Sequence, residues 1–106
     1  MRALNPLSPE DATLLEAVLD PKFAVQGLRN RDLVQTLYPK PSTDPGEKRR
    51  RSSRVTRLIR LLRAHSLLQK TPKSHRYQLS LDARKRITAV LAARNANAET
   101  LTANAA

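Results

Sequence analysis

The residues with the clearest chemical potential are seven arginines and one lysine in the stretch EKRRRSSRVTRLIRLLRAH, residues 47–65. Arginine is permanently charged and can form paired hydrogen bonds with a phosphate group or with the O6 and N7 atoms of guanine. Between these residues stand Val55, Leu58, Ile59 and Leu62, at offsets of three and four. That spacing predicts one helix with an aliphatic side for the core and an arginine side for a polyanion.

The predicted contact residues fall into two groups, one for DNA bases and one for the DNA backbone. A helical wheel of about 100° per residue places most polar residues of 49–60 away from the aliphatic stripe. The residues that we expect at base edges in the major groove are Arg50, Ser53, Arg54 and Arg57, and the short side chain of Thr56, at the edge of this face, allows the helix to approach the DNA closely. Those expected on the phosphate backbone or in the minor groove are Arg49, Arg60, Lys73, Ser74, His75 and Arg76. Arg51 and Arg63 fall on or near the core side and are expected to contribute little.

The elements that must position these side chains follow from capping residues and from the periodicity of apolar positions. Helices are predicted from Pro9 to about residue 20, after the cap Asn30 to Leu37, at about 45–65 and at about 81–97. A β-prone piece, Phe23 to Val25, separates the first two helices, and two alternating segments within about 67–80 predict a hairpin. The expected fold is mainly α with a small β-hairpin wing, in the order α-β-α-α-β-β-α, as a single domain over residues 1–106.

Local signals predict where the helices begin. Asp44 is the predicted N-cap of the long helix, and Pro45 suits its first position. Glu47 stands where the carboxylate of a capping box would reach back to the cap. Asn30 and Ser80 are the predicted caps of the second and the last helix.

The positive charge is concentrated in the middle third of the chain. The 106 residues carry a formal net charge of +11. Residues 48–81 contain eleven Lys and Arg and no acidic side chain, whereas residues 1–47 contain five basic and seven acidic ones. A basic surface that served solubility alone would be spread more evenly. This segregation therefore predicts a polyanionic partner, double-stranded DNA above all.

Composition argues against several other classes of protein. The chain has no cysteine, and its two histidines stand outside any carboxylate cluster, so neither a metal site nor a cofactor is expected. Two glycines cannot form a glycine-rich phosphate loop, and the sequence offers no paired carboxylates, so an enzyme is not expected. The small aliphatic core leaves no room for a small-molecule ligand. No apolar run approaches the ~20 residues of a membrane span, and no signal peptide is apparent, which predicts a cytoplasmic, nucleoid-associated protein.

The segment RVTRLIRLLRAHSLLQKTPKSHRYQLSLDARKRI, residues 54–87, resembles the recognition helix and wing of bacterial MarR- and ArsR-type regulators. Together with GLRNRDL upstream, it also resembles a module near the C-termini of longer, uncharacterised bacterial proteins. The likeness covers roughly Phe23 to Val90 and implies a winged helix-turn-helix domain that binds DNA and regulates transcription. Two departures concern the wing: those families carry glycine at the left-handed position where this chain has Ser66, and this wing contains no glycine.

Two other functions remain open from the sequence. The chain could be an architectural or targeting module of a larger protein, which binds DNA with little sequence preference. RNA is a weaker candidate, because single strands are usually bound on exposed aromatic rings and this chain has only three aromatic residues. Alternatively, the domain could bind another protein through the Leu61 side of the long helix or through the last helix. Four apolar residues of the last helix could also support a homodimer: Leu81, Ile87, Val90 and Leu91.

Overall fold

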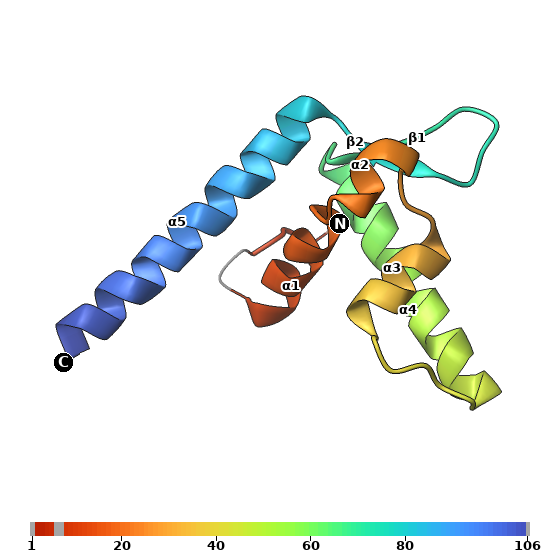
Figure 1. The fold of residues 1–106 in the computed structure, drawn as a ribbon, viewed down its shortest axis with the longest axis horizontal. Coiled ribbons are helices and arrows are strands. Elements are labelled where there is room, and N and C mark those ends of the chain that lie inside the picture. The colour runs from red at the N-terminus through yellow and green to blue at the C-terminus, as the bar shows by residue number, and fades with distance from the viewer. Residues whose placement is uncertain (1, 6–7, 106) are drawn as a thin grey trace.

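The computed structural model describes residues 2–5 and 8–105, with side chains described as far as residue 96. In this part of the chain the elements are five helices and two strands: α1 (Pro9–Val18), α2 (Lys22–Gln26), α3 (Asn30–Leu37), α4 (Pro45–Ala64), β1 (Leu68–Lys70), β2 (Tyr77–Leu79) and α5 (Leu81–Ala105). The strands pair antiparallel, with Gln69 opposite Gln78. The prediction of a mainly helical domain with one small hairpin is confirmed (Figure 1).

The prediction of a β-prone piece from Phe23 to Val25 is wrong, because these residues lie in helix α2. In a strand, Phe23 and Val25 would point to the same side. Instead Phe23 is buried, with 6% of its surface exposed, and Val25 is 84% exposed, which a helical turn allows. The Asp20 carboxylate accepts a hydrogen bond from the Lys22 N–H at 3.0 Å and supports the first turn. The observed order is therefore α-α-α-α-β-β-α.

Strand-like pairing upstream of α3 is confined to Leu28. Its N–H donates to the Tyr77 carbonyl and its carbonyl accepts from the Tyr77 N–H, both at 2.8 Å, in an isolated bridge to β2. Gly27 ends α2 with a φ of 73°, and a Cβ at this position would lie 2.8 Å from the Tyr77 carbonyl oxygen. Glycine is needed here because both the left-handed backbone and the close approach to β2 disfavour any side chain.

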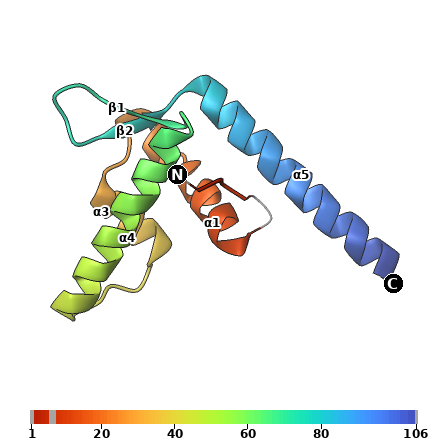
Figure 2. The same cartoon turned by 180° about the vertical axis from the view of Figure 1, so that it is seen from behind.

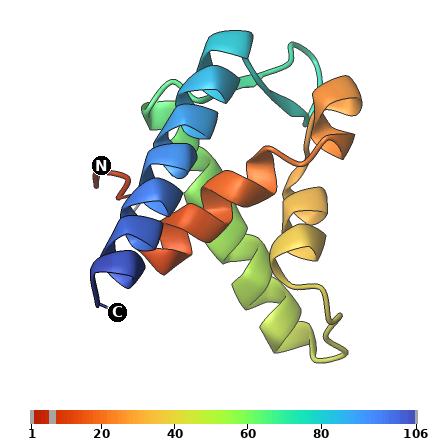
Figure 3. The same ribbon diagram turned by 60° about the vertical axis from the view of Figure 1, so that its left-hand side comes forward.

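The core lies where α1, α3, α4 and α5 meet, and α1 crosses the middle of the molecule between α5 and α3 (Figure 3). Of the predicted aliphatic stripe of α4, Val55, Ile59 and Leu62 are buried and Leu58 is partly buried against them. Leu61 is buried as well. The Leu61 side of α4 is therefore not a free surface for another protein, contrary to one of the functions left open above.

The ends of the helices agree with the sequence signals at two of three predicted caps. The Asp44 carboxylate accepts from the Gly46 N–H at 3.1 Å at the start of α4, and the Ser80 hydroxyl accepts from the Ala83 N–H at 3.0 Å at the start of α5. Asn30 is not a cap: Arg29 is the N-cap of α3, and Asn30 is its first residue. Arg29 follows the bridged Leu28 in an extended conformation, and its N–H donates to the Asp32 carboxylate at 3.0 Å, so α3 begins one residue earlier than the cap prediction requires.

Helix α5 is longer than predicted and continues to Ala105 rather than ending near residue 97. Alanine has the highest helix propensity, and three alanines in residues 98–105 favour the continuation of the helix. The helix projects from the domain (Figures 1 and 2). Ile87 and Leu91 are buried in the core, whereas Leu81 and Val90 are exposed. The homodimer through this helix stays a prediction, and a monomeric mass by light scattering at micromolar concentration would contradict it.

Ser66, the residue after the C-cap of α4, has a φ of 59° and so adopts the left-handed conformation expected at this position. The Cβ atom of serine is sterically strained in this conformation, whereas glycine has no Cβ. We therefore expect Ser66→Gly to raise the free energy of unfolding by about 1 kcal/mol, measured by urea denaturation. The control is Ser53→Gly inside α4, which should lower it by about half a kcal/mol because glycine destabilises a helix interior. Equal effects of the two substitutions would contradict the role of the φ angle.

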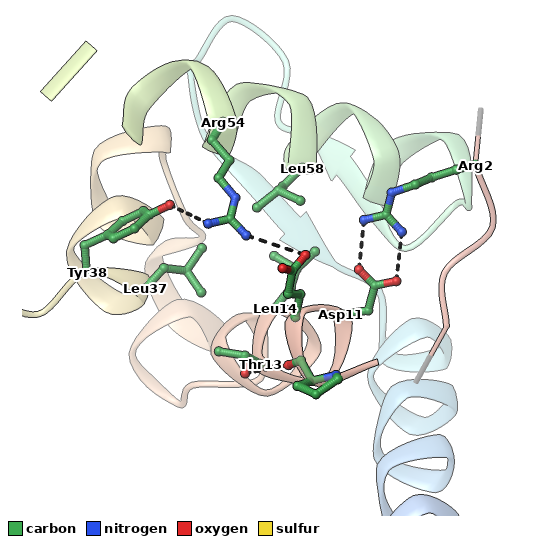
Figure 4. A pocket seen from close by; sticks show the side chains of 10 residues that line it. Arg2, Asp11, Thr13, Leu14, Leu37, Tyr38, Arg54 and Leu58 are labelled. Carbon is green, nitrogen blue, oxygen red and sulfur yellow. Dashed lines mark hydrogen bonds and ion pairs between the residues drawn. The ribbon is translucent and has the colours of Figure 1, made fainter. Parts of the chain in front are cut away.

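A buried carboxylate ties the N-terminal segment to α1. Asp11, 3% exposed, accepts two hydrogen bonds from the Arg2 guanidinium, both at 2.8 Å, and one from the Asn5 N–H at 2.9 Å (Figure 4). The hydrogen bonds from Arg2 lower the pKa of the Asp11 carboxyl, although burial opposes this shift. This network fixes the start of the chain beside the core.

We expect Asp11→Asn to lower the free energy of unfolding by about 2 kcal/mol at neutral pH, because charge-assisted hydrogen bonds are lost. The folded-state pKa of Asp11 lies below the unfolded value of about 3.9, so this stabilisation is present above that pH and is lost as the pH falls further. The difference between variant and wild type should therefore shrink in acid. Glu16→Gln, at an exposed position of the same helix, is the matched control and should change little.

Within the described residues, no helix combines the length and the apolar content that a membrane-spanning segment requires.

Candidate nucleic-acid interface

The basic elements share one side of the molecule. In Figure 1 the N-terminal end of α4 and the loop between β1 and β2 both lie on the side away from the free end of α5, and Figure 2 shows the same from behind. In α4 the first buried residue is Val55, so its N-terminal half, residues 45–54, extends beyond the core. We call residues 45–54 the projecting half of α4. Because none of its residues is buried in the core, this segment can carry several arginines.

Four arginines of α4 are exposed and form no ion pair with a described residue: Arg49, Arg57, Arg60 and Arg63. Ser53 is exposed near them. A concave surface along the exposed side of α4 is lined by Arg49, Ser53 and Arg57, together with further residues of this helix and Tyr38 at the end of α3. These side chains lie as the helical wheel predicts, on the side of α4 opposite Val55 and Leu62.

Arg50 is held by two acidic side chains at the start of α4. Its guanidinium donates to the Glu47 carboxylate at 2.9 and 3.1 Å and lies 3.8 Å from the Asp44 carboxylate. Hydrogen bonds from Arg50 and from Arg51 lower the pKa of the Glu47 carboxyl, so Glu47 is ionised at neutral pH. Glu47 therefore binds two arginines of its own helix and does not have the capping-box role predicted for it. Contact of Arg50 with a base would require this pair to separate.

Arg51 and Arg54 both interact with Tyr38, at the end of α3. The Arg51 guanidinium carbon lies 4.8 Å from the centre of the Tyr38 ring, and Arg54 donates to the Tyr38 hydroxyl at 2.8 Å. Arg54 also lies 4.0 Å from the Glu10 carboxylate of α1. Figure 4 shows the Arg54 head pointing into the pocket beside Tyr38 and above Leu14. Arg51, expected to contribute little, thus has a defined structural contact.

Asn30 joins the start of α3 to the middle of α4. Its amide nitrogen donates to the Ser52 carbonyl at 3.0 Å and to the Thr56 hydroxyl at 2.9 Å, and its amide oxygen accepts from the Ser52 hydroxyl at 3.2 Å. The Thr56 hydroxyl also donates to the Ser52 carbonyl. Thr56 therefore sits at the edge of the arginine side as predicted, with its hydroxyl already used within the protein.

The exposed side chains of the loop between β1 and β2 are Pro72, Lys73 and His75. Lys73 has a φ of 58°, which supplies the left-handed residue that the turn needs in the absence of glycine. The Ser74 hydroxyl accepts from the Arg76 N–H at 2.9 Å, and the Arg76 guanidinium donates to the Gln26 carbonyl at 3.1 Å. Of the four predicted wing contacts, Lys73 and His75 are thus displayed, while Ser74 and Arg76 also hold the loop in place.

A groove runs between the start of α3, the second half of α4 and the hairpin loop. Its basic lining residues are Arg29, Arg31, Arg60, Arg63 and His75. Arg63, expected to be a bystander, lies 5.6 Å from the Tyr77 ring centre and faces this groove. Sequence reasoning missed it because the wheel places Arg63 near the core, while the position of β2 beside the last turns of α4 is a tertiary feature. The one sequence signal for this contact is the alternation in the hairpin, which places Tyr77 on its inner side.

The arrangement defines a class of molecule: a small, mainly helical domain with an arginine-rich helix and a basic hairpin loop on one side. Comparison with models of protein families, with curated proteins and with solved structures found no match to this chain. Among the described residues, no three His, Cys, Asp or Glu side chains gather where they could hold a metal ion.

Proposed function

We propose that this domain binds double-stranded DNA as a winged helix-turn-helix, with α4 in the major groove and the hairpin loop on the backbone or in the minor groove. The observation that carries the proposal is the convergence of basic side chains from three separate parts of the chain on one groove. Arg31 comes from α3, Arg60 and Arg63 from α4, and His75 from the loop. A groove lined in this way attracts phosphate, and the exposed arginine side of α4 beside it can reach base edges.

The biological role that fits this activity is transcriptional regulation in the bacterial cytoplasm, on the nucleoid. This part of the proposal rests on the resemblance of residues 54–87 to the recognition helix and wing of MarR- and ArsR-type regulators. The sequence of elements supports it, because α3 and α4 are joined by the loop 38–44 and the hairpin follows α4 directly.

A second candidate function is binding of DNA with little sequence preference, as an architectural or targeting module. The ion pairs of Arg50 and the contacts of Arg54 favour this candidate, because they occupy two arginines that were expected at base edges. Fewer free arginines on α4 leave fewer groups for base recognition, while the basic groove remains for phosphate.

Selection of bound duplexes from a random pool, with a structured-RNA pool in parallel, separates these candidates. A recovered DNA motif supports sequence-specific binding. Retention of duplexes without any motif supports the second candidate. Preferential retention of RNA, or retention of neither pool, would contradict the proposal that double-stranded DNA is the partner.

A further inference from the structure

Tyr38 occupies an unusual place between the body of the domain and the projecting half of α4. Its N–H donates to the Val34 carbonyl at 2.8 Å at the end of α3, and its ring is partly buried against the core. Pro39 follows and restricts the backbone further. Tyr38 is therefore a rigid group, fixed to the domain, at the base of a helical segment whose own residues are not buried in the core.

The ring face and the hydroxyl of Tyr38 each contact an arginine of the projecting half. The ring face carries the Arg51 guanidinium at 4.8 Å, and the hydroxyl oxygen accepts from Arg54 at 2.8 Å. Aromatic rings attract cations through their negative faces, and the effect grows when the cation is partly shielded from water. The Arg51 side chain is 20% exposed, and its guanidinium also donates to the Lys40 carbonyl at 2.9 Å. Arg51 is thus fixed against the domain at several points.

Arg54 lies at the edge of the exposed arginine side of α4, and its guanidinium is turned toward Tyr38. Its side chain is 46% exposed, and one terminal nitrogen bonds to Tyr38 while the other lies 4.0 Å from Glu10 (Figure 4). Exposed pairs such as the one with Glu10 contribute little, so the hydroxyl of Tyr38 is the main group that sets the direction of Arg54. Arg57, one turn further on, has no such partner among the described residues and stays exposed.

We propose that Tyr38 is a positioning residue that holds Arg51 and Arg54 against the domain and so decides which arginines of α4 are free to contact nucleic acid. The consequence for binding rests on the proposed function, whereas the consequence for the helix does not. Without Tyr38, the projecting half loses its stacked anchor and opens more often. If only the hydroxyl is removed, Arg54 is released and adds one mobile cation to the DNA-facing surface.

Two substitutions separate these effects. Tyr38→Phe keeps the ring and removes the hydroxyl, and Tyr38→Leu removes both. The control is Thr88→Val, which removes a hydroxyl from an exposed position of α5, outside the proposed interface. Two measurements are made on each folded protein: amide hydrogen exchange along α4, and the salt dependence of binding to a duplex.

In Tyr38→Leu, amides of residues 48–54 should exchange about threefold faster or more, relative to those of residues 55–62. In Tyr38→Phe, the slope of log K against log salt should steepen by roughly 0.9, the value for one added phosphate contact. Thr88→Val should change neither quantity. If Tyr38→Leu does not fold, the slope of Tyr38→Phe decides the proposal.

Unchanged exchange in Tyr38→Leu, or an unchanged slope in Tyr38→Phe while the wild type binds duplex DNA, overturns the role of Tyr38 and leaves the proposed function intact. If the wild type does not bind duplex DNA, the proposed function fails. The exchange measurement then decides by itself whether Tyr38 anchors the projecting half.

Discussion

Binding of this protein to duplex DNA should weaken steeply with salt, by about 10³-fold or more between about 50 and about 200 mM monovalent salt. The physical reason is the release of counterions from phosphates that arginine and lysine neutralise. About six to nine neutralised phosphates correspond to a slope of log K against log salt of roughly −5 to −8. Because Arg50 is paired with Glu47 and Arg54 contacts Tyr38, we expect the shallower end of this range. Fluorescence anisotropy titrations at several salt concentrations measure the slope.

The slope also tests where the contact surface lies. Lys85→Ala removes an exposed charge from α5, outside the interface, and should leave the slope unchanged. Arg60→Ala removes a charge that lines the groove between α4 and the hairpin loop, and should make the slope shallower by roughly 0.9. A slope near zero for the wild type would contradict a phosphate-based interface altogether, and equal effects of the two substitutions would contradict its location.

The second large effect concerns Arg57. Substitution of Arg57 by alanine should weaken binding to a selected duplex by about 1–3 kcal/mol more than binding to random duplexes, if the side chain forms a bidentate contact with guanine. Arg57 is suited to this contact because it is exposed in the middle of α4 and forms no ion pair with a described residue. On random DNA only a phosphate contact would be lost. Parallel titrations of both duplexes measure the difference.

Arg54→Ala is the informative comparison for Arg57→Ala. Both residues carry the same charge on the same helix, but the Arg54 head is turned toward Tyr38 and Glu10. We expect Arg54→Ala to weaken binding to both duplexes by a similar small amount. Equal losses on the two duplexes for Arg57→Ala as well would contradict base recognition and favour binding with little sequence preference.

Much of the fold could be predicted because its signals are local. The aliphatic spacing of Val55, Leu58, Ile59 and Leu62 depends only on helical periodicity, and the Asp44 cap depends only on residues two positions apart. The hairpin likewise followed from alternation over a few residues. Phe23 to Val25 was misassigned because three residues are too few for a period to be read, and the burial of Phe23 against the core decides in favour of a helix.

The candidate site was predictable in composition but not in detail. Sequence alone determined that the positive charge is segregated and that one helix separates an aliphatic side from an arginine side, since both depend on residue type and spacing. Only the tertiary structure decided the partner of each arginine. Tyr38 reaches Arg54 across 16 positions of sequence, and Glu10 approaches the same side chain from another helix. Such contacts depend on how α1, α3 and α4 pack, and no local pattern encodes that packing.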